Sequence, residues 1–181
     1  MILDATAGNR TMWRCKHSKN IIYIDIEKRL EVKPTIFCDN TRTPFRDKVF
    51  DTIFYDPPHF YNDKGSYYVY PDAESFQKKW KGYGRIPRYY GGDKYKTKAQ
   101  LMRHIIEAGR EFYRILKDDG LLWLKWNESH IPLATILHLL EDWNELLRIY
   151  VKAPTQTAGK HQTYWVCLEK KKQKTMQTTL A

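Results

Sequence analysis

The sequence predicts an α/β fold with a doubly wound, mostly parallel sheet of about seven strands and an antiparallel hairpin at one edge. Three observations lead to this fold class. Short apolar runs recur along the 181-residue chain, helical patterns separate the later runs, and an acidic residue follows each of the first four runs. Since strands that alternate with helices form parallel sheets, we expect a mostly parallel sheet that is covered on both faces.

The first two expected strands lead into acidic residues. Ile2 and Leu3 precede Asp4, and the chain then turns through the small residues 5–8. Small side chains let a ligand approach the backbone closely, although a purely structural turn would have the same composition. Residues 21–24 form the second strand and precede Asp25. This residue has the spacing of the acid that holds ribose hydroxyls in doubly wound folds, and capping of the next segment is the alternative role.

The third and fourth expected strands end in the same way. Residues 35–38 lead to Asp39 and Asn40, a pair suited to an adenine edge or to a simple turn. Residues 49–55 lead to Asp56. Ligands of open α/β sheets lie beyond the carboxyl ends of the strands. Acidic strand ends in succession therefore predict a site for a nucleoside cofactor and its substrate.

A long helix and a further strand follow. Residues 97–116 carry apolar side chains at helical spacing, and the Lys-Asp-Asp-Gly run at 117–120 predicts the end of this helix and a turn. Residues 121–126 then form a short apolar run that only Lys125 interrupts. Such a run, bounded by turn residues, predicts a buried strand.

The last elements are a helix and two strands. Residues 129–143 predict a helix, with Pro132 tolerated in its first turn. Residues 146–151 and 163–168 predict two strands, which we expect to form the antiparallel hairpin at the edge of the sheet.

The fourth strand runs directly into Asp56-Pro57-Pro58-His59. Proline fixes its own φ, has no N–H and disfavours helical geometry in the residue before it, so Asp56 and Pro57 should leave the strand extended. The Asp56 carboxylate and the Pro57 carbonyl are then two acceptors, which suit a group with two hydrogens to donate, such as the exocyclic amine of a nucleobase. His59 supplies a flat ring that is able to stack on that base. The alternative is a Pro-Pro pair that merely ends a strand.

These segments resemble two motifs of one enzyme group. Residues 56–59 resemble the Asp-Pro-Pro-Tyr/Phe/Trp motif of the Rossmann-like, S-adenosylmethionine-dependent methyltransferases that modify N6 of adenine or N4 of cytosine, and residues 3–8 resemble their first cofactor motif. The similarity extends over residues 1–60 by motif and 97–170 by element order. Two departures stand out. His59 replaces the usual large aromatic residue, and the sequence begins at the first strand, without the helix that in many relatives closes over the methionine end of the cofactor.

The resemblance implies an enzyme with S-adenosyl-L-methionine as its cofactor. The spacing of the histidines and cysteines indicates no metal site. It assigns the cofactor to strand ends and to the first turn: Asp4, Ala5, Thr6, Gly8, Asp25, Asp39 and Asn40. It assigns catalysis to Asp56, Pro57, Pro58 and His59. DNA is the favoured substrate. RNA is the closest alternative, and a catalytically silent nucleic-acid-binding subunit or a methyltransferase for a small molecule or a protein glutamine are further ones.

The charge of the chain indicates a nucleic-acid partner. Lys and Arg number 31 against 21 Asp and Glu, a formal net charge of +10. Residues 61–100 interrupt the alternation of strands and helices with a basic insert rich in tyrosine, suited to phosphates, to unpaired bases and to a substrate lid. The residues assigned to substrate binding are Tyr61, Lys78, Lys79, Trp80, Lys81, Arg85 and Arg88. The alternative is a tyrosine-rich subdomain that packs on itself, with lysines that only solvate it.

The remaining features limit the class of protein. We expect a single domain over residues 1–170 and a flexible basic tail over 171–181. No apolar stretch approaches the roughly 20 residues that cross a membrane. The sequence has 3 cysteines without Cys-x-x-Cys spacing, which indicates idle thiols in a reducing compartment such as the cytoplasm rather than disulfides or a zinc site.

Overall fold

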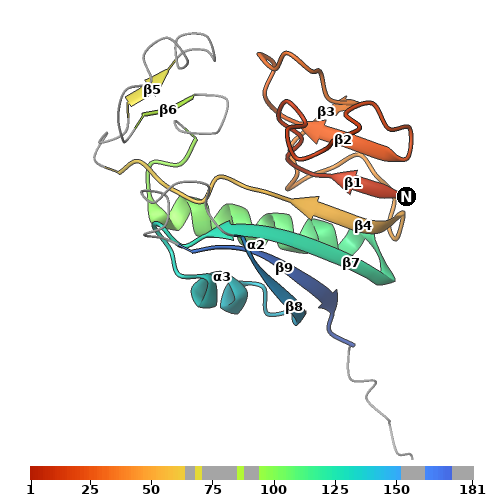
Figure 1. The fold of residues 1–181 in the computed structure, drawn as a ribbon. Helices are drawn as coiled ribbons and strands as arrows, with labels where there is room; N and C mark the ends of the chain where they lie inside the picture. Colours follow the sequence, from red (N-terminus) through yellow and green to blue (C-terminus); the bar gives the residue numbers. More distant parts are fainter. Residues whose placement is uncertain (64–67, 71–84, 88–93, 152–161, 173–181) are drawn as a thin grey trace, which may run out of the picture.

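A computed structural model describes residues 1–63, 68–70, 85–87, 94–151 and 162–172 (Figure 1). Seven strands form one sheet in the order β3-β2-β1-β4-β7-β9-β8. The strands are β1 (Ile2–Asp4), β2 (Ile21–Asp25), β3 (Ile36–Phe37), β4 (Phe50–Tyr55), β7 (Leu116–Asn127), β8 (Trp143–Val151) and β9 (Thr163–Lys170). The first five strands along that order pair in parallel, whereas β9 pairs antiparallel with both β7 and β8. The predicted fold class is therefore confirmed, including the antiparallel edge pair.

Part of the insert forms a second, smaller sheet. Strands β5 (Tyr68–Tyr70) and β6 (Arg85–Pro87) pair in parallel with each other and not with the main sheet. The rest of residues 64–93 lies outside the described residues, so the expectation of a lid or recognition element stays a prediction.

Helix α2 (Lys98–Ile115) confirms the long helix that was expected between β4 and β7. Thr97 caps its first turn, because the Thr97 hydroxyl accepts from the Gln100 backbone N–H while the Gln100 side chain accepts from the Thr97 N–H. Leu101, Ile105 and Phe112 repeat at helical spacing and are fully buried. The apolar stripe of α2 thus packs into the main core of the domain.

Helix α3 (Leu133–Leu139) is shorter than the helix expected over 129–143. Pro132 is the N-cap and not a first-turn residue, and it has no side-chain oxygen with which to cap the helix. The Glu128 carboxylate accepts from the Leu133 N–H at 2.9 Å instead. The residues before Pro132 are held in a turn, in which Asn127 Oδ1 accepts from the Ser129 N–H. Residues 140–142 lie outside any helix or strand, and Trp143, the last residue of the expected helix, begins β8.

Strand β7 begins earlier than expected, at Leu116, so the turn predicted over 117–120 is wrong. Phe50 pairs with Leu116 and Thr52 with Leu121, so residues 117–120 form an irregularity within the strand. Gly120 lies so close to β4 that a Cβ atom there would be 3.0 Å from the Asp51 carbonyl oxygen. Pairing with β4 therefore outweighs the tendency of residues 117–120 to form a turn.

Within the described residues both helices pack on one face of the sheet, and the connection from β1 to β2 covers part of the other. The core that contains α2 and α3 includes Leu3, Ile53 and Leu122 from three neighbouring strands. On the opposite face, the connection from β1 to β2 has turns and no helix. Its Trp13 packs with Tyr23 in a second, smaller cluster. This connection begins with the turn after β1, which lies at the carboxyl end of that strand.

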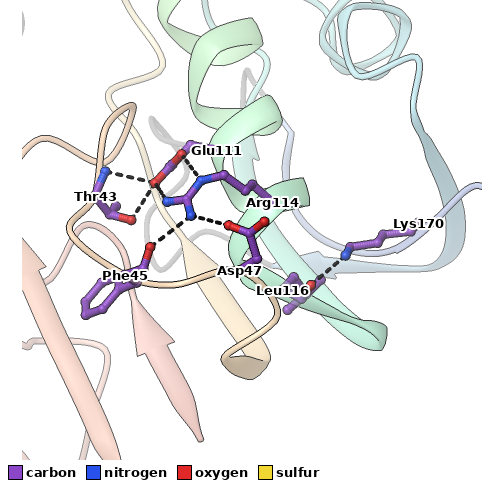
Figure 2. Close-up of polar contacts among 7 residues, drawn as sticks. All are labelled: Thr43, Phe45, Asp47, Glu111, Arg114, Leu116 and Lys170. Atoms are coloured by element: carbon purple, nitrogen blue, oxygen red, sulfur yellow. Dashed lines mark hydrogen bonds and ion pairs between the residues drawn. The ribbon is translucent and has the colours of Figure 1, made fainter.

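An ion-pair network fastens the loop between β3 and β4 to α2 (Figure 2). Glu111 Oε1 accepts from both the N–H and the hydroxyl of Thr43, at 2.9 and 2.5 Å. Arg114 donates to Glu111, to the Asp47 carboxylate at 2.6 Å and to the Phe45 carbonyl at 2.9 Å. Partial burial opposes ionisation of Glu111, but the hydrogen bonds from Arg114 and Thr43 hold its pKa below the usual value. The same view shows the buried Lys170 donating to the Leu116 carbonyl at 2.5 Å.

Candidate functional site at the strand ends

The sheet order brings together the polar strand ends that the sequence predicts. Strands β3, β2, β1 and β4 are consecutive and parallel, so Asp39, Asp25, Asp4 and Asp56 lie at or directly after the same edge. Their spacing across the sheet is that of neighbouring strands, about 5 Å per strand. The four acids thus lie along one edge of the sheet, and their assignment to ligand binding stays a prediction.

The turn after β1 runs over this edge. The Ala5 N–H donates to the Phe54 carbonyl at 2.8 Å, and the Ala7 N–H donates to the Ile24 carbonyl at 3.0 Å. Gly8 has a φ of +49°, a conformation that favours glycine, and no atom lies within 4 Å of the position a Cβ would take. The turn is therefore tied to strands on both sides, and open space remains beside Gly8.

Asp4 is the most deeply buried of these acids, with 1% of its surface exposed. Trp13 Nε1 donates to its Oδ2 at 2.7 Å and the Thr6 N–H donates to its Oδ1 at 3.2 Å. Burial raises the pKa of Asp4 from 3.8 to about 6, against the effect of these two hydrogen bonds. Trp13 is a residue that the sequence analysis did not assign to the site.

Asp25 combines the two roles that the sequence left open. Its Oδ1 accepts from the Glu27 N–H at 2.8 Å, which caps the following turn, and its Oδ2 accepts from the Gly8 N–H at 2.8 Å. Burial raises its pKa, while these backbone N–H groups lower it. A carboxylate has about four lone-pair sites, so these two bonds leave acceptor capacity for ligand hydroxyls.

Asn40 bridges to the turn after β1 and keeps one acceptor unused. Its Nδ2 donates to the Ala5 carbonyl at 3.0 Å, while its Oδ1 is buried and has no hydrogen-bond partner among the described residues. Asp39 Oδ1 accepts from the N–H and the hydroxyl of Thr41, at 2.9 and 2.8 Å. A buried acceptor without a donor is costly unless a ligand or water satisfies it. An amino group such as that of adenine fits this position.

Asp56 lies where the turn after β1 and the central strands meet. Its N–H donates to Thr6 Oγ1 at 2.8 Å, which links it directly to that turn. Its Oδ2 accepts from Lys125 Nζ at 2.7 Å. Pro57 is buried and Pro58 half-buried. Asp56 is therefore held by two contacts, one from each neighbouring segment.

His59 does not lie as an open stacking ring. Its ring meets Phe60 and Trp126 edge-on, with centroids 6.1 and 6.2 Å apart. Its Nδ1 is buried without a hydrogen-bond partner among the described residues. Burial lowers the pKa of His59 from its usual value, since it disfavours the charged imidazolium form. Its assignment to base stacking stays a prediction.

The residues assigned to substrate binding are described only in part. Tyr61 is half-buried and its ring meets His130 edge-on at 5.6 Å. Arg85 begins β6, and its side chain is not described. The assigned residues Lys78, Lys79, Trp80, Lys81 and Arg88 lie outside the described residues.

Sequence reasoning missed Lys125 and Trp13 as neighbours of the site. The sequence does mark Lys125 as unusual, since it is the one charged side chain in the otherwise apolar run 121–126. Trp13 gave none, because its contact with Asp4 depends on how residues 5–20 fold back over β1 and β2.

Other kinds of site find no support in the part of the chain that the structure describes. No group of three or more His, Cys, Asp or Glu side chains there is arranged to hold a metal ion. Cys15, Cys38 and Cys167 are free thiols. Among these residues no helix is long and apolar enough to pass through a bilayer.

Comparison with known proteins gives the fold and not the family. No family model matches this sequence, and no curated protein matches it. Several solved structures are similar, among them three methyltransferases. A TehB-like SAM-dependent methyltransferase from Corynebacterium glutamicum has a TM-score of 0.54 at 13% identity, over 94% of this chain and 79% of its own. The N-methyltransferase NodS from Bradyrhizobium japonicum has a TM-score of 0.54 at 11% identity, over 94% of this chain and 85% of its own. The third is the 1,6-didemethyltoxoflavin-N1-methyltransferase from Burkholderia thailandensis, solved with 1,6-didemethyltoxoflavin and S-adenosylhomocysteine bound. It has a TM-score of 0.53 at 14% identity, over 94% of this chain and 71% of its own.

Proposed function

We propose that this protein is an S-adenosylmethionine-dependent methyltransferase that acts on an exocyclic amino group of a nucleobase. The observation that carries the proposal is the hydrogen bond from the Asp56 N–H to Thr6 Oγ1 at 2.8 Å. It fixes the amine-accepting motif beside the turn assigned to the cofactor, as transfer from one bound molecule to another requires. The similar fold of proteins described as SAM-dependent methyltransferases and N-methyltransferases supports the reaction class.

The strand ends fit the cofactor. Asp25 has acceptor capacity for the ribose hydroxyls, Asn40 Oδ1 is a buried acceptor in need of a donor, and the space beside Gly8 admits a ligand close to the backbone. Asp4 supplies buried negative charge at the end of β1. The cofactor supplies an electrophilic methyl group when it is bound. The residues around it orient that group and exclude water.

Asp56 and Pro57 hold the amine in this proposal. An amine on a base ring is a poor nucleophile, because its lone pair is delocalised into the ring. When the Asp56 carboxylate and the Pro57 carbonyl accept its two N–H groups, the lone pair is directed at the methyl group. Correct alignment of two reactants supplies on the order of 7 kcal/mol or more. The amine nitrogen gains a bond to the methyl carbon while the bond between that carbon and the sulfonium sulfur breaks and its electron pair returns to sulfur. The nitrogen then loses a proton, which Asp56 accepts or relays.

Nucleic acid is the proposed partner, with DNA favoured and RNA the closest alternative. The net charge of +10 supports a phosphate-bearing substrate. A target base in duplex DNA has to leave the stack at a cost of a few kcal/mol, whereas a base in a single strand does not. A small heterocycle is the second candidate, because the Burkholderia neighbour is described with such a compound bound.

The test is incubation with S-adenosylmethionine that carries a labelled methyl group and with separate pools of duplex DNA, single-stranded DNA, RNA and free nucleosides. Analysis of the digested products identifies the polymer, the base and the methylated atom. N6-methyladenine or N4-methylcytosine that depends on Asp56 supports the proposal. Label on free nucleosides alone would favour the small-molecule candidate, and label on ring nitrogens or carbons would contradict the amino-group assignment.

A further inference from the structure

We propose that Lys125 is a positioning residue for Asp56, which holds one carboxylate oxygen so that the other accepts the substrate amine. This inference rests on the proposed function. Lys125 Nζ lies 2.7 Å from Asp56 Oδ2. Asp56 Oδ1 has no hydrogen-bond partner among the described residues. The carboxylate therefore has one occupied oxygen and one available oxygen.

Strand pairing brings the two charges together. Tyr55 on β4 pairs with Leu124 on the parallel strand β7, so Asp56, directly after the end of β4, lies beside Lys125, which is still within β7. The lysine comes from a strand in the middle of the sheet and not from a loop. Its partner is fixed from the other side by the bond between the Asp56 N–H and Thr6. The geometry of the pair is thus set by the fold.

A tryptophan limits the freedom of the lysine side chain. In the antiparallel pairing of β7 with β9, Lys125 lies opposite Trp165. Its Nζ is 5.8 Å from the centre of the Trp165 ring, within the range of a cation–π contact. The ammonium group is therefore in contact range of both a carboxylate and an aromatic ring. Both contacts favour the same rotamer, which reduces the entropy that a long side chain loses on pairing.

Orientation of the carboxylate is what the amine requires. A lone Asp side chain rotates about its terminal torsion, for which the preference is broad. A charge-assisted hydrogen bond to Oδ2 restricts that rotation and fixes the direction of Oδ1. One N–H of the amine then binds Asp56 Oδ1, and the other remains for the Pro57 carbonyl. Lys125 does not contact the reacting atoms in this arrangement, so its effect passes through Asp56.

A purely structural ion pair would behave differently. The side chains of Lys125 and Asp56 are 33% and 29% exposed, so the pair itself adds little to stability. A matched control lies on the same strand, where Lys117 pairs with Asp51 at 2.6 Å, far from the strand ends that carry the site. Replacement of either lysine by methionine removes the charge and keeps the length of the side chain.

The experiment measures transfer to whichever substrate the wild-type protein methylates. We expect Lys125→Met to lower kcat by about tenfold to a hundredfold, with the Kd for S-adenosylmethionine and the Tm unchanged, since a charged hydrogen bond is lost at the amine and not at the cofactor. Lys125→Arg should retain most of the rate. Lys117→Met should leave kcat unchanged. An equal effect of the two methionine variants, or an unchanged kcat in Lys125→Met, would overturn the assignment.

A double-mutant cycle with Asp56→Asn tests whether Lys125 acts through Asp56. If it does, Lys125→Met slows the Asp56→Asn variant far less than it slows the wild type. Independent, multiplicative effects would overturn the positioning role while leaving the proposed function intact. A wild-type protein that transfers no methyl group to any pool would instead overturn the proposed function, and this inference with it.

Discussion

The Thr6 hydroxyl accepts the backbone N–H of Asp56 at 2.8 Å and so connects the turn after β1 with the end of β4. A second bond, from the Ala5 N–H to the Phe54 carbonyl at 2.8 Å, lies directly before it. The two motifs that the sequence places about 50 residues apart are therefore one structural unit, built on the parallel pairing of β1 with β4. The relative position of cofactor and amine depends on this unit.

Thr6→Val should lower the rate of transfer by about tenfold, because it keeps the shape of the side chain and leaves the Asp56 N–H without its acceptor. Thr6→Ser retains the hydroxyl and should keep most of the rate. Single-turnover kinetics at saturating cofactor separate this effect from cofactor binding. Equal rates for the valine and serine variants would show that the bond does not position Asp56.

Asp56→Ala should abolish transfer and leave the Kd for S-adenosylmethionine nearly unchanged. The carboxylate is assigned to the amine, and its hydrogen-bond partner within the described residues is Lys125, not the turn assigned to the cofactor. Isothermal titration calorimetry gives the Kd, and transfer of labelled methyl groups gives the rate. Retained turnover in the alanine variant would remove Asp56 from the mechanism.

Asp25→Ala should weaken binding of the cofactor, since the ribose hydroxyls lose a charged acceptor worth about 1.5 to 3 kcal/mol per hydrogen bond. It should also lower stability, because the N–H groups of Gly8 and Glu27 lose their acceptor. Asp25→Asn keeps one acceptor oxygen and should bind the cofactor with intermediate affinity. Calorimetry on both variants and the wild type checks this order of cofactor affinities. Loss of stability with unchanged affinity would reduce Asp25 to a turn residue.

Local sequence patterns predict those parts of the fold in which local interactions prevail. Helix α2 begins after Thr97 because its capping box and its apolar stripe lie within one segment. The acids at or after the ends of β1, β2, β3 and β4 are predicted to lie along one edge, because parallel strands place their carboxyl ends there. The run 117–120 is predicted wrongly, since its turn residues are outweighed by pairing with β4.

The contacts of the site depend on tertiary structure and are harder to predict. Lys125 reaches Asp56 only because β7 is the neighbour of β4, a relation that hydrophobic periodicity does not contain. Trp13 reaches Asp4 because the connection after β1 folds back without forming a helix. His59 follows a proline pair that suggests an exposed ring, yet it packs against Trp126, which comes from another strand.

Glu111→Ala should lower the free energy of unfolding by about 1 to 3 kcal/mol, because Thr43 and Arg114 both lose their shared carboxylate. The loop that follows Asp39 and Asn40 would loosen from α2, so the Kd for the cofactor should rise as well. Glu107→Ala is the matched control on the same helix, since its pair with Arg103 is exposed, at 3.5 Å. In urea denaturation, the control substitution should lower the free energy of unfolding by less than about 0.5 kcal/mol. Equal losses in the two variants would contradict a structural role of the network.

Asp4 should make the stability depend on pH. Its pKa is raised by burial from 3.8 to about 6, so folding favours the protonated form. Stability from this group is therefore fully present below about pH 4 and is lost as the pH rises through about 6, by about 3 kcal/mol in total. Asp4→Asn has no carboxyl group at this position and therefore lacks this pH-dependent contribution to stability.

Urea denaturation between about pH 4 and pH 7.5 measures the effect, as the difference in unfolding free energy between Asp4→Asn and the wild type. The unfolding free energy of the asparagine variant should increase relative to that of the wild type as the pH rises. Trp13→Phe should steepen the loss of stability in the Asp4-containing protein, because the indole N–H at 2.7 Å favours the charged carboxylate. A difference that stays constant across this range would show that Asp4 titrates normally and that its burial does not perturb it.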